Sequence, residues 1–156
     1  MQPALLNALR TRRPQMRHQW EALLRASPVT TPLGNPDALV HLIDWTLDEI
    51  FSCLGNPLAR QRSNRSRSFV SARTECLCGR NPLLTYFEAG AQTMHEALVL
   101  AQADMSPLDP LERDAAFAEL NLVLQNTSQR EIEAFCGVCQ FRAHTCPARP
   151  ETAHVA

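Results

Sequence analysis

The sequence predicts an all-α protein, an irregular helical bundle built around a long antiparallel helical hairpin at about 82–105 and 110–140. Apolar residues recur at the three- and four-residue spacing of helix faces, and no segment shows the strict alternation of a strand. An Asn-Pro pair precedes three of the apolar segments, as expected where helices begin. The length of 156 residues suits one domain, which we place at 1–147, with 148–156 as a flexible tail.

The amino-terminal stretch carries apolar residues at helical spacing on both sides of Pro14. Proline lacks an amide hydrogen and its ring clashes with the preceding turn, so Pro14 is expected to divide this stretch into two helices or to kink one. The apolar residues concerned are Leu5, Leu6, Leu9, Met16, Trp20, Leu23 and Leu24.

The Asn-Pro pairs at 35–36, 56–57 and 81–82 predict helix starts. An Asn side chain can accept a hydrogen bond from an amide of the first turn, and Pro has no amide hydrogen to satisfy there. The segment after the first pair has an apolar stripe that ends before Gly55, a residue type common just beyond helix C-termini. The stripe consists of Val40, Ile43, Leu47, Ile50 and Leu54.

The hairpin is predicted from two long apolar seams joined by a short connection near Pro107. The first seam keeps a heptad-like spacing, which is typical of a helix packed against another helix. It consists of Leu84, Phe87, Ala91, Met94, Leu98, Ala101 and Met105. The second seam weakens around 126–128 and then resumes. It consists of Phe117, Leu120, Leu124, Ile132, Phe135, Cys136 and Cys139.

Five of the six cysteines form two clusters, Cys76-x-Cys78 and Cys136-x2-Cys139-x6-Cys146. At about 1.5 Å of rise per residue, the first hairpin helix is about 34 Å long, and a partner that retraces this length returns close to Cys136. Reflection about position 107 takes position 78 to position 136. We therefore expect the two clusters to meet at one end of the hairpin.

Four thiolates meeting at one point would make a tetrahedral zinc site, with Cys76, Cys78, Cys136 and Cys139 as the first choice of ligands. Either Cys146 or His144 could replace one of these four. A [4Fe–4S] cluster is the alternative cofactor, because the Cys-x2-Cys-x6-Cys spacing with a distant cysteine suits cubane ligation. The third reading has no metal: the cysteines are then buried small apolar residues or a reversible dithiol.

Charge is distributed unevenly along the chain, although the net charge is only −1. Residues 1–80 hold 11 Arg and 6 acidic residues, whereas residues 81–156 hold 4 Arg and 10 acidic residues. The basic half could contact nucleic acid or could pack beside the acidic half. The run Arg60, Arg62, Arg65 and Arg67 is the candidate phosphate-contacting loop, and a solvated connection is its favoured interpretation.

Other candidate residues are interpreted as surface. His41, Asp44 and Asp48 share one helical face, which we interpret as a solvent-facing stripe, with Trp45 beside it as a partner surface. His95 could ligate haem, but a packed or exposed helix histidine is commoner. No apolar run reaches the roughly 20 residues that span a bilayer, and no secretory segment is recognised, so a cytoplasmic location without a membrane partner is expected.

Three functions remain open from the sequence. The first is a zinc-binding helical protein with a sensor, regulatory or accessory role, exerted on a protein partner or through homo-oligomer formation. The second is a redox-responsive iron–sulfur or dithiol protein that senses or transfers electrons. The third is a nucleic-acid-binding module that uses the Arg60–Arg67 loop. An enzyme is not expected, because no nucleophile–base or acid–base set can be assembled.

Overall fold

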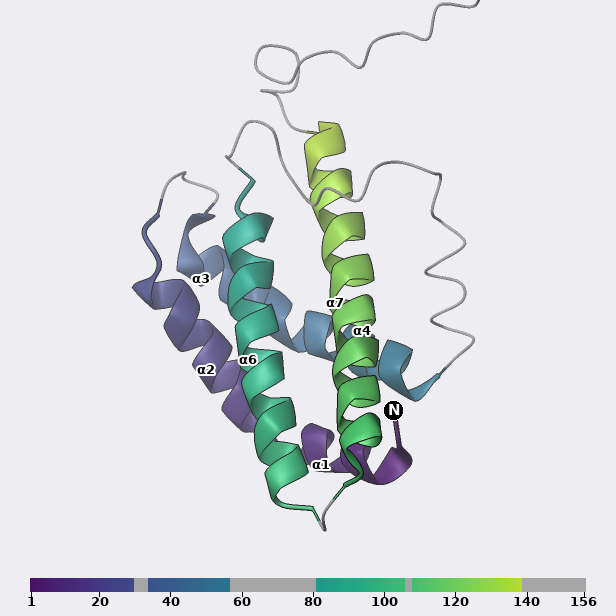
Figure 1. Cartoon of the computed structure of the whole chain (residues 1–156). Helices are drawn as coiled ribbons and strands as arrows, with labels where there is room; N and C mark the ends of the chain where they lie inside the picture. Colours follow the sequence, from purple (N-terminus) through teal and green to yellow (C-terminus); the bar gives the residue numbers. More distant parts are fainter. Residues whose placement is uncertain (30–33, 57–80, 106–107, 139–156) are drawn as a thin grey trace, which may run out of the picture.

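A computed structural model describes residues 1–29, 34–56, 81–105 and 108–138, and within these ranges every regular element is helical. The predicted all-α class and helical bundle are confirmed. Figure 1 shows α6 and α7 side by side, with α2 beside α6, α1 at the end of the bundle where α6 leads into α7, and α4 crossing behind. In order, the elements are α1 (Pro3–Thr11), α2 (Arg13–Ala26), α3 (Pro36–Leu39), the 3-10 turn η2 (Val40–Leu42), α4 (Ile43–Gly55), α6 (Leu83–Ala103) and α7 (Pro110–Val138). No helix in the described ranges combines the length and apolar character needed to cross a bilayer.

The amino-terminal stretch divides into α1 and α2 as expected, and the break falls at Arg12. Pro14 occupies the second position of α2, where its missing amide hydrogen leaves no partner unsatisfied. Both helices bury the predicted apolar face, including Leu9 and Trp20.

The Asn caps act as the sequence predicts at two of the three pairs. The side-chain oxygen of Asn35 accepts a hydrogen bond from the amide of Asp37 at 3.0 Å, and that of Asn81 accepts one from Leu83 at 3.0 Å. Asn56 follows the last residue of α4, and position 57 and the helix start predicted there lie outside the described residues. The helix expected after Asn35 is not continuous, because it tightens into η2 before α4 begins.

α6 is the central helix of the bundle and packs against α1, α2 and α7. It therefore buries residues on a second face in addition to the single predicted apolar seam. Phe87, Met94, Leu98 and Ala101 of that seam are buried, and Leu84, Ala91 and Met105 are partly buried. A second group, outside the seam, is also buried because α1 and α2 cover that side: Tyr86, Ala89, Gly90, Thr93 and Ala97.

The core is joined across three helices by buried polar contacts. The indole nitrogen of Trp20 in α2 donates to the carbonyl oxygen of Tyr86 in α6 at 3.0 Å, and their rings are 4.9 Å apart. The hydroxyl of Tyr86 lies 2.8 Å from that of Thr46 in α4. Thr46 donates to the carbonyl of Leu42, so Tyr86 is the donor of this pair. The buried side-chain polar atoms of Trp20, Tyr86 and Thr46 are therefore all hydrogen-bonded.

The α6 and α7 helices run in opposite directions. The Gln102 side chain donates to the carbonyl of Arg113 near their connection, and His95 bonds Asn121 midway along. At the far end, Asn81, just before α6, donates to the carbonyl of Ile132. Residue numbers fall along α6 as they rise along α7, so the start of α6 lies beside the last turns of α7 (Figure 1).

Candidate metal centre

Of the five cysteines predicted as ligands, Cys136 is within the described residues. Cys76, Cys78, Cys139 and Cys146 lie outside them, as does the possible substitute ligand His144. Within the described ranges, no group of three or more His, Cys, Asp and Glu side chains is arranged to hold a metal ion. The predicted ligand set is therefore neither confirmed nor contradicted, and the described part of the centre consists of Cys136 and its surroundings.

Cys136 is placed by the last two turns of α7. Its side chain is a thiol, partly buried, and packs against the hydrophobic core one turn beyond the buried Ile132. Ile132 and Cys136 are four residues apart and so lie on the same face of α7, the face that packs against the bundle. Cys136 is thus an interior-facing sulfur close to the end of a helix.

Asn81 is the side chain that meets this sulfur. Its amide nitrogen donates to Cys136 Sγ at 3.5 Å and to the carbonyl oxygen of Ile132 at 3.3 Å. Asn81 is only 3% exposed, although it lies outside the regular part of α6. The sequence identified Asn81 as a helix cap but gave no sign of this second contact. The contact joins the chain just before α6 to the end of α7.

The acidic stripe on α4 forms ion pairs with α2. Asp48 and Asp44 both bond Arg13, and the Asp44 carboxylate also lies 3.0 Å from the Arg17 side chain. The hydrogen bond from Arg13 lowers the pKa of Asp48. His41, the third predicted member of the stripe, is exposed. These groups form a charged surface between helices, and no His–carboxylate ligand set is assembled here.

His95 is also engaged in packing. Its Nε2 atom lies 2.6 Å from Asn121 Oδ1, and its ring is 6.1 Å from that of Phe117. The imidazole therefore bridges α6 and α7, as expected of a packed helix histidine.

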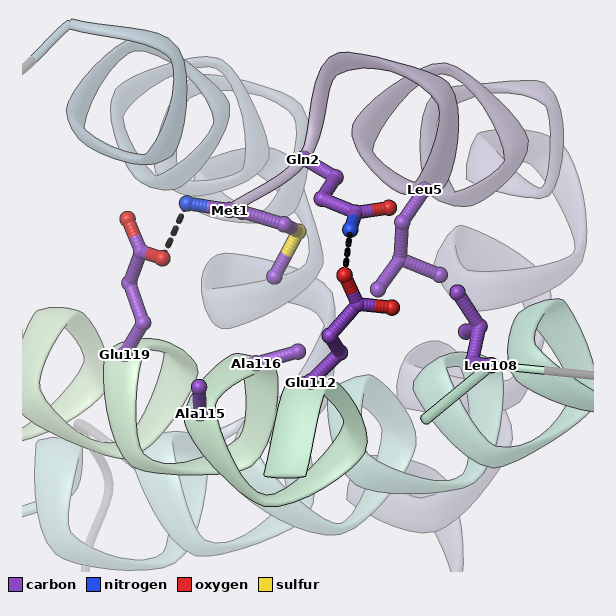
Figure 2. Close-up of a pocket in the computed structure, with 8 residues that line it drawn as sticks. All are labelled: Met1, Gln2, Leu5, Leu108, Glu112, Ala115, Ala116 and Glu119. Atoms are coloured by element: carbon purple, nitrogen blue, oxygen red, sulfur yellow. Dashed lines mark hydrogen bonds and ion pairs between the residues drawn. The ribbon is translucent and has the colours of Figure 1, made fainter. Parts of the chain in front are cut away.

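A small cavity of about 180 Å³ lies between the amino terminus and the start of α7 (Figure 2). Two of its carboxylates are occupied by the chain itself: Glu119 pairs with the Met1 ammonium group, and Glu112 accepts from the Gln2 amide at 2.6 Å. The rest of the lining is apolar and includes Leu5 and Leu108. Both carboxylates are thus bound by groups from the first two residues of the chain.

Of the remaining predicted sites, one lies outside the described residues and one lies within them. The run Arg60, Arg62, Arg65 and Arg67 lies outside the described residues. Trp45 is 52% exposed and Leu42, three residues earlier, is 40% exposed. The partner surface at Trp45 stays a prediction. Compared with protein-family models, with characterised proteins and with solved structures, the chain matches none of them.

Proposed function

We propose that this chain is a zinc-binding helical protein in which Cys76, Cys78, Cys136 and Cys139 hold one zinc ion, with Cys146 or His144 as the substitute for one ligand. A closed site with four ligands is structural, so the metal would stabilise the fold and would not carry a reaction. In this proposal the protein has a regulatory or accessory role, exerted through contact with another protein or with a second copy of itself.

The contact between Asn81 and Cys136 is the observation that supports the site. Three peptide units separate Asn81 from Cys78, which limits their Cα atoms to a separation of about 11 Å. Three units likewise separate Cys136 from Cys139. Asn81 lies against Cys136 Sγ, so positions 81 and 136, to which the two cysteine clusters are joined along the chain, are neighbours in the bundle. A tetrahedral zinc site takes four ligands, and we propose that the two pairs of thiols supply them.

The metal is tested by elemental analysis of protein purified without oxygen, followed by chelation. One zinc per chain, lost together with helical circular dichroism on chelation, is the expected result. Iron with inorganic sulfide would move the assignment to the iron–sulfur alternative. Protein that carries no metal and refolds fully in the presence of chelator would contradict the proposal.

The role in protein contact rests on two exposed apolar side chains three residues apart, Leu42 at the end of η2 and Trp45 in α4, since exposed apolar patches often mark interaction surfaces. Sedimentation velocity over a wide concentration range tests the second-copy form of this role. Wild-type protein should self-associate, and the double variant Leu42→Ser with Trp45→Ser should do so less. A wild type that remains monomeric at all concentrations contradicts self-association.

A further inference from the structure

A continuous chain of ion pairs joins α2 to α3 and α4. Arg13, Arg17, Glu21 and Arg25 recur every four residues along α2, so their side chains share one face of that helix. This face meets carboxylates of the next two helices. In order, the linked side chains are Asp48, Arg13, Asp44, Arg17, Glu21, Arg25 and Asp37.

Glu21 links the two halves of this chain of charges. Its Oε2 atom lies 3.5 Å from the Arg17 side chain, and its Oε1 atom lies 2.9 Å from that of Arg25. Arg17 in turn pairs with Asp44 of α4, whereas Arg25 pairs with Asp37 of α3. Glu21 is also less exposed than the two arginines that it joins. Through Glu21, the ion pairs of α4 and the ion pair of α3 belong to one network, and networks stabilise more than isolated surface pairs do.

The segment formed by α3 and η2 is short and buries little apolar surface. α3 has four residues and η2 has three, and their buried side chains are Leu39 and Val40. Segments with few buried apolar groups open at a lower free energy than the core does, and 3-10 turns often mark hinges. The ion pair of Asp37 with Arg25 holds this segment to α2 from the side.

We infer that these seven side chains form one ionic clasp, linked through Glu21, which holds α3 and η2 against α2 and which rising salt concentration loosens. Salt screens exposed charges, since the Debye length falls from about 10 Å at 0.1 M to about 3 Å at 1 M. The clasp makes the position of η2, and with it the exposed Leu42, depend on ionic strength. This inference needs no metal and is independent of the proposed function.

Glu21→Gln breaks the link and leaves the other six side chains in place. Glutamine has nearly the same size as glutamate and a similar helix propensity, so α2 should keep its helix. Its neutral amide no longer attracts two guanidinium groups. The matched control is Glu88→Gln, which makes the same change at an exposed position of α6 outside the clasp.

The test measures hydrogen exchange of single backbone amides by NMR at low and at high salt. The amides of Leu39 and Val40 bond carbonyls at the start of α3, so they report on the clasped segment, and the amides of α6 and α7 report on the rest of the bundle. At low salt we expect Glu21→Gln to speed exchange at Leu39 and Val40 by about two- to fivefold, the size expected for exposed ion pairs. Exchange in α6 and α7 should stay at the wild-type rate, and Glu88→Gln should match wild type at Leu39 and Val40.

Added salt should bring wild-type exchange at Leu39 and Val40 to the rate of Glu21→Gln, and it should change the variant little. Rates at these two amides that respond neither to salt nor to Glu21→Gln overturn the inference. An increase of the same size throughout α6 and α7 also overturns it, because it would show general destabilisation of the bundle instead of a local clasp.

Discussion

The indole ring of Trp20 lies directly against the α-carbon of Gly90, so that any side chain at position 90 would overlap the ring. Trp20 is fully buried, and its indole nitrogen is held by the Tyr86 carbonyl one turn earlier in α6. Glycine is unfavourable within a helix, and here its role is to let α2 and α6 approach closely.

Replacement of Gly90 by Ala should therefore destabilise the protein, although alanine is the better helix former. The added methyl group forces Trp20 out of its place, and overpacking of this kind costs about 1–3 kcal/mol. Urea unfolding followed by circular dichroism measures the change. Gly137→Ala is the control, since nothing lies within 4 Å of a methyl group there, and it should be neutral or stabilising by up to about 1 kcal/mol. Equal effects at both glycines would contradict this role of Gly90.

Tyr86 should resist ionisation in the folded protein. Burial is the largest cause, and it raises the pKa of Tyr86 above its ordinary value of 10.0. A raised folded pKa means that the contribution of Tyr86 to stability is complete below pH 10 and is lost as the pH rises beyond it. Because the chain has one tyrosine, the ultraviolet absorbance of tyrosinate reports this residue alone. Tyrosinate should appear only together with unfolding, and titration near pH 10 in a folded protein would contradict the buried position.

The hydroxyl pair of Tyr86 and Thr46 should contribute a modest amount to stability. Tyr86→Phe removes the donor while the Thr46 hydroxyl keeps its bond to the Leu42 carbonyl, so the expected loss is about 1 kcal/mol. A double-mutant cycle with Thr46→Val measures the coupling between the two hydroxyls. A coupling energy near zero would show that this contact does not contribute to the free energy of unfolding.

The ion pair of Asp48 with Arg13 should make only a small, acid-sensitive contribution. The pKa of Asp48 is lowered chiefly by the hydrogen bond from Arg13, so its contribution is present above the ordinary value of 3.8 and is lost as the pH falls below it. Both side chains are substantially exposed, and water and salt screen such pairs. Asp48→Asn should flatten the pH dependence of unfolding below pH 4, and an unchanged slope would argue against the pair.

If Cys136 binds zinc as proposed, Cys136→Ser should destabilise the protein far more than Cys53→Ser does, because Cys53 is a packed core residue and not a proposed ligand. Thermal unfolding with and without chelator separates the two effects. Chelator should lower the melting temperature of wild type and of Cys53→Ser, and should leave Cys136→Ser unchanged. Equal and mild effects of both substitutions, with no response to chelator, would contradict a shared site.

The local structure was the part that the sequence predicted well. The side chains of Asn35 and Asn81 cap helices because capping depends only on neighbouring residues, and Pro14 marks the division between α1 and α2 for the same reason. The apolar stripe from Val40 to Leu54 is buried throughout. These features need no knowledge of distant parts of the chain.

Contacts between distant segments were predicted less completely. The second buried face of α6 includes Gly90, against which Trp20 packs from a helix some seventy positions earlier. No local sequence pattern predicts that pairing of helices. The contact from Asn81 to Cys136 is likewise not predicted from the sequence, because helix capping alone is enough to explain an Asn at position 81. The meeting of positions 78 and 136 that helix length predicts stays a prediction, because position 78 lies outside the described residues.

We propose that sulfur atoms from both cysteine clusters bind one zinc ion. Zinc K-edge X-ray absorption on the purified protein tests it most directly, because zinc–sulfur distances of about 2.3 Å differ from zinc–nitrogen and zinc–oxygen distances of about 2.0–2.2 Å. We expect a shell of four sulfur atoms around the zinc ion, or three sulfur atoms with one nitrogen if His144 replaces a cysteine. A shell of nitrogen and oxygen alone, or protein that takes up no zinc, would contradict it.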